Sequence, residues 1–144
     1  MPGESAYVDT SIIGAYYSPE TLSEKAESAL LAIEDPVLSN LCDVEFASLI
    51  ARKQKLKDLS ERQAIEILQL FDSHMAQGFY RRVSLSADHF LRARQLVAGA
   101  DGSLRTLDAL HLAVAVVEIL PLLTADRELA KAARRFKVEV ILIN

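Results

Sequence analysis

Short apolar runs alternate along this chain with stretches in which apolar residues recur at helical spacing. The first run, at 6–8, ends abruptly at Asp9, and apolar side chains then return about one helical turn apart. This pattern predicts a buried strand that leads directly into a helix. Later runs of similar character predict four further strands. They lie within 36–39, 79–85, 121–124 and 138–143.

Helices are predicted between these strands from capping residues and apolar stripes. Asn40 can cap a helix from 41 to about 52, and Ser60 with Gln63 has the spacing of a capping box. Gly78 is expected to end the helix that this capping box begins. The regular alternation of strands and helices favours a three-layer α/β/α sandwich with a mainly parallel central sheet.

Size and composition narrow the class of protein. The chain has 144 residues, 51% of them hydrophobic, which suits one domain over 1–144 with a full core. It has no apolar run of membrane-spanning length and no signal-peptide pattern, so we expect a cytoplasmic protein without membrane contact. Its single cysteine, Cys42, excludes an intrachain disulfide or thiolate zinc site and is expected to be buried. The net charge of −4 argues against nonspecific coating of nucleic acid, but not against a nuclease.

Four acidic residues fall at points where a parallel sheet would bring them together. Asp9 and Asp126 each follow an apolar strand, while Glu45 and Asp108 each lie early in a helix. Right-handed crossovers would place all four at the carboxyl edge of the strands, where α/β proteins bind ligands. Asp43 is an alternative to Glu45, but two residues apart on a helix point in nearly opposite directions, so only one can face the site.

Such a cluster favours a metal site, because like charges at short range repel one another and need a cation. Carboxylate oxygens suit Mg²⁺ or Mn²⁺, and such an ion can activate water and stabilise charge on a phosphodiester. Metal-assisted phosphodiester hydrolysis is therefore the chemistry that the four acids best support. The alternative is that each acid only caps a helix, which is the stronger interpretation for Asp126.

Other polar residues near the acids are weaker candidates. His111 follows Asp108 by three residues and can reach the same crevice, although such a histidine is more often satisfied within its own fold. Arg105, three residues before Asp108, can steady that carboxylate or meet a substrate phosphate. His74 and His89 lack an acidic or cysteine partner at ligand spacing and are expected on the surface.

A family resemblance rests on four segments, 7–11, 39–45, 107–113 and 122–129, which include all four acids. The segment 107–113, Leu-Asp-Ala-Leu-His-Leu-Ala, is the most specific, and 39–45 is the loosest. Together they resemble the PIN-domain family, and most closely the VapC-type ribonuclease toxins of VapBC toxin–antitoxin modules. The resemblance covers nearly the whole chain. It implies an α/β/α sandwich, a Mg²⁺ or Mn²⁺ site and endonucleolytic cleavage of RNA.

The resemblance also implies roles for single residues. Asp9 would be the central metal ligand, and Glu45 and Asp108 would bind metal directly or through water. Asp126 would support a second metal ion or order a water, so all four acids are expected to be catalytic. Polar residues beside the acids would hold the scissile phosphate or a carboxylate. They are Thr10 or Ser11, and Thr124.

The resemblance implies protein partners as well. Members of this family are usually neutralised by an antitoxin whose C-terminal segment wraps the toxin, and they commonly form homodimers. Apolar residues of the early helices, such as Ile13, Leu30 and Ile33, either form a groove for a partner helix or belong to the core.

Two other functions remain open from the sequence. The same site could serve RNA maturation or decay without an antitoxin. A non-enzymatic phosphoacceptor or binding module is a different class, since receiver-type domains also carry an aspartate at a strand tip. Against it, the chain lacks an acidic pair just before Asp9 and a clear lysine after its last strand.

Overall fold

The computed structural model describes residues 4–144, and this part of the chain forms five strands and seven helices. The strands are β1 (Ser5–Val8), β2 (Asp35–Ser39), β3 (Arg81–Val83), β4 (Leu122–Thr124) and β5 (Val140–Leu142). The helices are α1 (Thr10–Tyr17), α2 (Ser23–Leu31), α3 (Asn40–Lys55), α4 (Glu61–Ala76), α5 (Ala87–Ala98), α6 (Thr106–Glu118) and α7 (Arg127–Arg135). Each expected strand is present, although β3, β4 and β5 are shorter than the apolar runs that predicted them.

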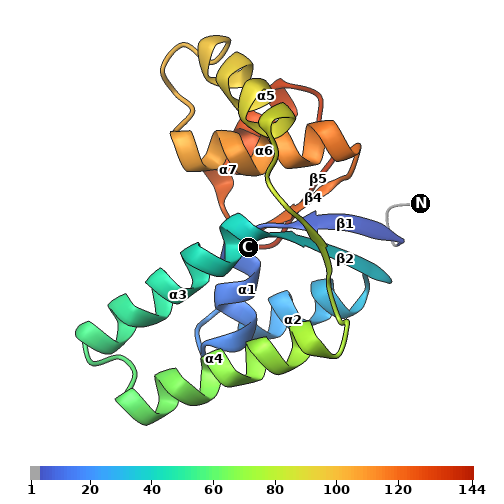
Figure 1. Cartoon of the computed structure of the whole chain (residues 1–144). Helices are drawn as coiled ribbons and strands as arrows, with labels where there is room; N and C mark the ends of the chain where they lie inside the picture. The colour runs from blue at the N-terminus through green and yellow to red at the C-terminus, as the bar shows by residue number, and fades with distance from the viewer. Residues whose placement is uncertain (1–3) are drawn as a thin grey trace.

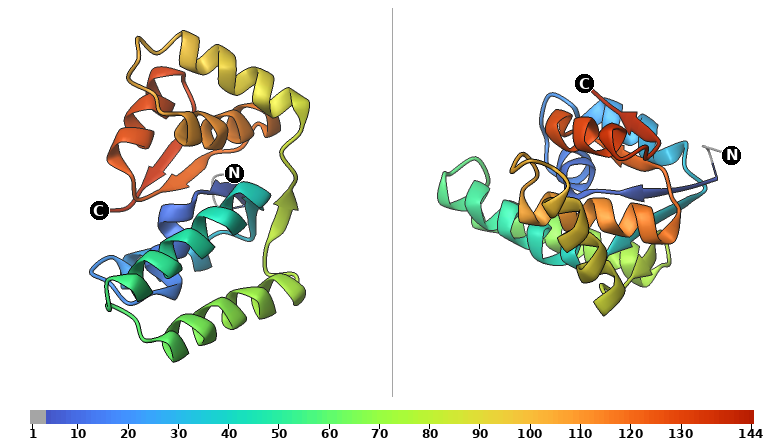
Figure 2. Two further views of the ribbon diagram at one scale, coloured as in Figure 1. Left: turned by 60° about the vertical axis from the view of Figure 1, so that its left-hand side comes forward. Right: turned by 90° about the horizontal axis from the view of Figure 1, so that it is seen from above.

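The strands form one sheet in the order β3-β2-β1-β4-β5, and all neighbouring pairs are parallel. β1 is central, and its Tyr7 lies in register with Val37 of β2 and Leu122 of β4. Helices α1 to α4 lie on one side of the sheet and α5 to α7 on the other (Figures 1 and 2). The predicted three-layer α/β/α sandwich is confirmed, with a sheet that is parallel throughout.

The two faces of the sheet support separate hydrophobic cores, because successive strand residues point to opposite faces. Ala6 and Val8 belong to the core beneath α1 to α4, whereas Tyr7 belongs to the core beneath α5 to α7. None of these three side chains has exposed surface. Each strand of the centre is therefore buried on both faces, as expected for a parallel sheet.

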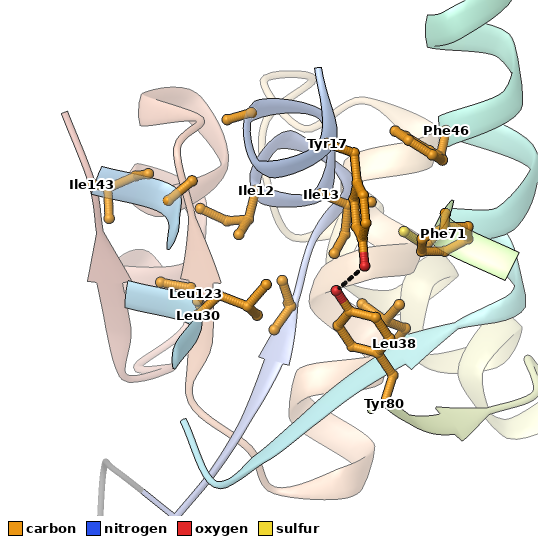
Figure 3. Close-up of a cluster of buried hydrophobic side chains, with 14 of the residues drawn as sticks. Ile12, Ile13, Tyr17, Leu30, Leu38, Phe46, Phe71, Tyr80, Leu123 and Ile143 are labelled. Carbon is orange, nitrogen blue, oxygen red and sulfur yellow. Dashed lines mark hydrogen bonds between the residues drawn. The ribbon is translucent and has the colours of Figure 1, made fainter. Parts of the chain in front are cut away.

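The first core is rich in aromatic rings. Tyr17 of α1 makes an edge-to-face contact with Phe71, at 5.4 Å between ring centroids, and packs against Phe46. Its hydroxyl is 2.6 Å from that of Tyr80, a buried bond drawn in Figure 3. The apolar residues of the early helices that could have formed a groove lie in this core, and Ile13, for example, is fully buried. Ile13, Leu30 and Ile33 are core residues, and Tyr16 is partly buried against the same core.

The helix ends follow the expected chemistry only in part. The predicted N-cap role of Asn40 is wrong: Ser39 is the N-cap residue of α3, and the Asn40 side chain accepts a hydrogen bond of 3.0 Å from the backbone N–H of Leu85. Ser60 and Gln63 form a complete capping box at the start of α4, and Gly78 follows that helix with a φ of +77°. Helix α6 instead ends on Ile119, a β-branched residue with φ 56° and ψ 56°. Left-handed backbone is unfavourable for such a residue, so α6 ends under local strain. Within residues 4–144, no helix is long and apolar enough to cross a membrane.

Replacing Ile119 by glycine should raise the free energy of unfolding. The substitution relieves the left-handed strain, which is worth roughly 1–2 kcal/mol. Glycine also gives the unfolded chain more conformational freedom, and this offsets part of the gain. The side chain is 88% exposed, so little packing is lost. We expect a net gain of about 1 kcal/mol in urea unfolding. Ile119→Val keeps the β-branch and should show no gain; equal stability of wild type and Ile119→Gly would contradict the assignment of strain.

Candidate active site

Asp9 lies at the end of the central strand, where it begins helix α1, and its side chain is 4% exposed. The hydroxyl of Ser11 donates a hydrogen bond of 2.6 Å to Asp9 Oδ1. The same hydroxyl accepts one of 2.9 Å from the backbone N–H of Ala125. Asp9 is thus tied through Ser11 to the end of the neighbouring strand β4.

Asp126 caps helix α7, as the stronger of the two interpretations of its role predicted. Its Oδ1 accepts hydrogen bonds from the backbone N–H groups of Glu128 and Leu129, at 2.9 and 3.1 Å. Its charge nevertheless reaches the other acids, because it raises the pKa of both Asp9 and Asp108. Asp126 is therefore a helix cap that also belongs to the acidic edge.

Glu45 faces the same edge from the second turn of α3. Its Oε1 accepts a hydrogen bond of 2.6 Å from the Thr10 hydroxyl and a short one from the Nε2 of His111. Asp43, two residues earlier, instead forms an ion pair with Arg82. The expectation from helix geometry that only one of these two acids can face the site agrees with these contacts.

Asp108 lies in the first turn of α6, which begins at the same edge of the sheet. Arg105, the N-cap residue of that helix, places Nε 3.9 Å from Asp108 Oδ2, but its own side chain is 82% exposed. This is a loose contact that water screens, so it steadies Asp108 only weakly. The exposed guanidinium leaves Arg105 accessible to a substrate.

The hydroxyl residues beside the acids hold protein groups. Thr10 donates to Glu45, and Ser11 donates to Asp9. Thr124 is fully buried, and its hydroxyl accepts a hydrogen bond of 2.9 Å from the backbone N–H of Asp126. Of the two expected roles, holding a phosphate or holding a carboxylate, these contacts favour the second.

The electrostatics of the edge show an excess of negative charge. Burial raises the pKa of Asp9 to about 6, and Asp126 adds to this, while His111, Ser11 and Thr124 lower it. The pKa of Asp108 is raised by burial, by Asp126 and by Glu45, against the lowering effect of Arg105 and His111. The carboxylates therefore destabilise one another in their ionised forms.

The donor chemistry of this edge fits a hard divalent cation. Carboxylates offer oxygen ligands, and a cation would relieve the repulsion that, together with burial, raises the pKa values of Asp9 and Asp108. Within residues 4–144, however, no group of three or more His, Cys, Asp or Glu side chains is placed closely enough to hold a metal ion. The four acids lie at one edge of the sheet, and some of them affect the pKa values of others, but they are not close enough together to form a metal-binding group.

His111 is the residue whose importance the sequence underestimated. Its ring is 2% exposed and bonds to Glu45 on one side and to the Tyr7 hydroxyl on the other. Its spacing from Asp108 was the available signal, whereas nothing local pointed to Tyr7.

The surface prediction for His89 is wrong: it is 4% exposed, and its Nε2 lies 3.0 Å from Glu118 Oε2. Cys42 is buried as expected.

Replacing Asp9 by asparagine should stabilise the metal-free protein at neutral pH. The folded pKa of Asp9 is raised from 3.8 to about 6, so its contribution to stability is complete below about pH 4 and is lost as pH rises through about 6. Asparagine stays neutral and can still accept from Ser11. We expect a gain of order 1–3 kcal/mol near pH 7.5 and none near pH 4, measured by urea unfolding with chelator present. A variant less stable than wild type at the higher pH would contradict the buried charge.

The family model of the PIN domain matches residues 6–135 of this chain. No protein with a curated function matches it in sequence. Among solved structures, FitAcB from Neisseria gonorrhoeae shares 18% identity over 94% of this chain and 96% of its own, with a TM-score of 0.71. VapC20 from Mycobacterium tuberculosis, described as a toxin that cleaves the sarcin-ricin loop, shares 19% over 88% and 94%, at a TM-score of 0.69.

VapBC2 from Rickettsia felis, solved with a DNA fragment of its promoter, shares 14% identity with this chain. The match covers 97% of this chain and 99% of that one, with a TM-score of 0.69. These structures share the fold over nearly their full lengths. The family model, which spans most of the chain, identifies it further. The chain belongs to the PIN domain family.

Proposed function

We propose that this chain is a divalent-metal-dependent endoribonuclease, the toxin of a type II toxin–antitoxin module, built as a single domain over 1–144. The observation that supports the proposal is the placement of Asp9, Glu45, Asp108 and Asp126 at or near the starts of four helices of a PIN-domain fold. The mutual effect of the acids on their pKa values supports it, since it marks a site that favours a cation.

The four acids would hold Mg²⁺ or Mn²⁺, with Asp9 as the central ligand. When bound, such an ion supplies Lewis acidity to the phosphodiester and lowers the pKa of water. The protein's own residues prepare the edge for it. Ser11 and Thr10 orient Asp9 and Glu45 through hydrogen bonds of 2.6 Å each, and burial of Asp9 excludes bulk water from its carboxylate. Arg105, exposed beside Asp108, can contact a phosphate of the RNA backbone.

The proposed partners are an antitoxin and a second copy of the chain. Support for the antitoxin comes from similar folds solved as a toxin–antitoxin complex from Klebsiella pneumoniae and as FitAB bound to a DNA fragment. The protein would act on RNA in the cytoplasm. A nuclease for RNA maturation would share the site but lack a cognate antitoxin, so co-purification with the product of an adjacent gene separates the two roles.

Neutralising a site acid should abolish RNA cleavage while the fold is kept. We expect Asp9→Asn and Glu45→Gln each to lower kcat/KM by at least about 100-fold, because loss of even indirect metal contacts commonly costs 10- to 100-fold. Asp43→Asn is the matched control, since Asp43 shares helix α3 with Glu45 but pairs with Arg82 outside the acidic edge. Cleavage by Asp9→Asn at the wild-type rate with saturating Mn²⁺ would refute the proposal.

Removing divalent metal should abolish cleavage, and adding it back should restore activity and stabilise the fold. A ligand that binds only the folded state at 100 times its Kd adds about 2.7 kcal/mol to the free energy of unfolding. Mn²⁺ should therefore raise the Tm of the wild type, and should do so much less for Asp9→Asn. Full RNA cleavage in excess chelator would show that the acids serve another chemistry.

A further inference from the structure

A chain of buried hydrogen bonds links Glu45 to the centre of the sheet. The Ser39 hydroxyl on β2 is 2.8 Å from the Tyr7 hydroxyl on β1, which is 2.6 Å from Nδ1 of His111 on α6. The other ring nitrogen, Nε2, bonds to Oε1 of Glu45 on α3. Ser39 and Tyr7 are fully buried, and His111 is 2% exposed. Water therefore cannot replace a bond that is lost from this chain, which makes each bond costly to remove.

The chemistry of the bonded groups determines which atom donates and which accepts in each of these hydrogen bonds. An ionised carboxylate only accepts hydrogen bonds, so Nε2 of His111 carries the proton that faces Glu45. Burial raises the pKa of Tyr7 far above its ordinary value, so its hydroxyl keeps its proton. In the neutral ring, Nδ1 then accepts from Tyr7, and the Tyr7 oxygen accepts from Ser39. The Tyr7 contact thus holds the ring in place, and Nε2–H donates to Glu45 in both the neutral and the protonated ring.

The consequence falls on one oxygen of Glu45. Oε1 accepts from both Thr10 and His111, whereas within residues 4–144 no side chain or backbone group donates to Oε2. Two donors from different elements, α1 and α6, therefore fix the carboxylate by one oxygen. The other oxygen is left for a ligand from outside the chain.

His89 shows what a histidine with a purely structural role does in this protein. It is almost as buried as His111 and also contacts a carboxylate, Glu118 at the far end of α6. It belongs to the capping box that begins α5 and contacts none of the four acids. His111 differs in that its carboxylate partner is Glu45.

We propose that His111 is a positioning residue for the metal site. Its Nε2–H, on a ring held by Tyr7 and Ser39, fixes Oε1 of Glu45 and would leave Oε2 to bind a divalent cation. This inference rests on the proposed function, since it attributes part of the metal affinity of that site to His111.

The test compares Mn²⁺ affinity, measured by calorimetry, among full-length variants whose folding is verified by thermal unfolding. His111→Leu removes the donor and should weaken Mn²⁺ binding by about 10- to 100-fold, the usual cost of losing a group that orients a metal ligand. His111→Gln offers an amide N–H to Glu45 and an amide oxygen to Tyr7, so it should recover most of the affinity. Tyr7→Phe should cause a smaller loss, because it frees the ring without removing the donor.

His89→Leu is the matched control and should leave Mn²⁺ affinity unchanged. Wild-type affinity in His111→Leu would overturn the proposal. So would equal losses in folded His111→Leu and His111→Gln, because the ring would then act through packing and not as a donor. If His111→Leu does not fold, Mn²⁺ affinity is compared among His111→Gln, Tyr7→Phe and wild type. Wild-type Mn²⁺ affinity in Tyr7→Phe would then overturn the proposal that Tyr7 holds His111 in place.

An NMR measurement separates this inference from the proposed function. If wild type binds no Mn²⁺ and cleaves no RNA, the proposed function fails, and the contact is then tested without metal. Among three histidines, the ring N–H signal that His111→Gln removes is that of His111. We expect a slowly exchanging Nε2–H resonance that Glu45→Ala abolishes. Absence of that signal from wild type, or its survival in Glu45→Ala, would overturn the positioning role.

Discussion

The burial of an ionisable carboxyl group at the end of the central strand is the constraint on which the rest of the site depends. β1 lies between β2 and β4, so Asp9 at its end is enclosed on both sides as well as by α1. Removing a carboxylate from water is costly unless nearby groups compensate it. Ser11, Thr124 and His111 each favour its ionised form, and burial still prevails. The fold holds this charge in an unfavourable place, which is typical of functional sites.

The acids compete for very little positive charge. His111 is buried beside Glu45, and burial by itself lowers its pKa, but the hydrogen bond and charge of Glu45, with Asp9 and Asp108, raise it overall. For Glu45 burial acts in the opposite sense and is outweighed by His111 and Thr10, so its pKa is lowered. One imidazole cannot balance four carboxylates. The remaining imbalance supports the divalent cation that we propose for this edge.

The core and the site share one residue, which links stability to function. Tyr7 packs its ring among the apolar residues beneath α5 to α7, and its hydroxyl reaches His111 and Ser39. A parallel strand buried on both faces can carry a polar group only where that group finds a hydrogen-bond partner. Here the partner is His111 of α6. Packing of the Tyr7 ring thus fixes the orientation of the series of hydrogen bonds that ends at Glu45.

Much of the architecture could be predicted from local signals along the chain. Strands were expected where short apolar runs occur, and Ser60 with Gln63 announced the start of α4. The placement of Asp9 and Asp126 after strands, and of Glu45 and Asp108 early in helices, is also visible in the printed sequence. Each of these signals lies within a few residues of the feature it predicts, and local backbone preference and side-chain periodicity are enough to read it.

The sequence by itself therefore determined the order of the elements, their layered class and the acids available to a site. Only the tertiary structure decided the strand order, the burial of His89, and the contacts of Tyr7 and Glu45 with His111, which are 104 and 66 residues away along the chain. Such contacts depend on which strands become neighbours and on which face each side chain emerges. No short window of sequence carries that information, because a shift of one residue along a strand turns its side chains to the opposite face.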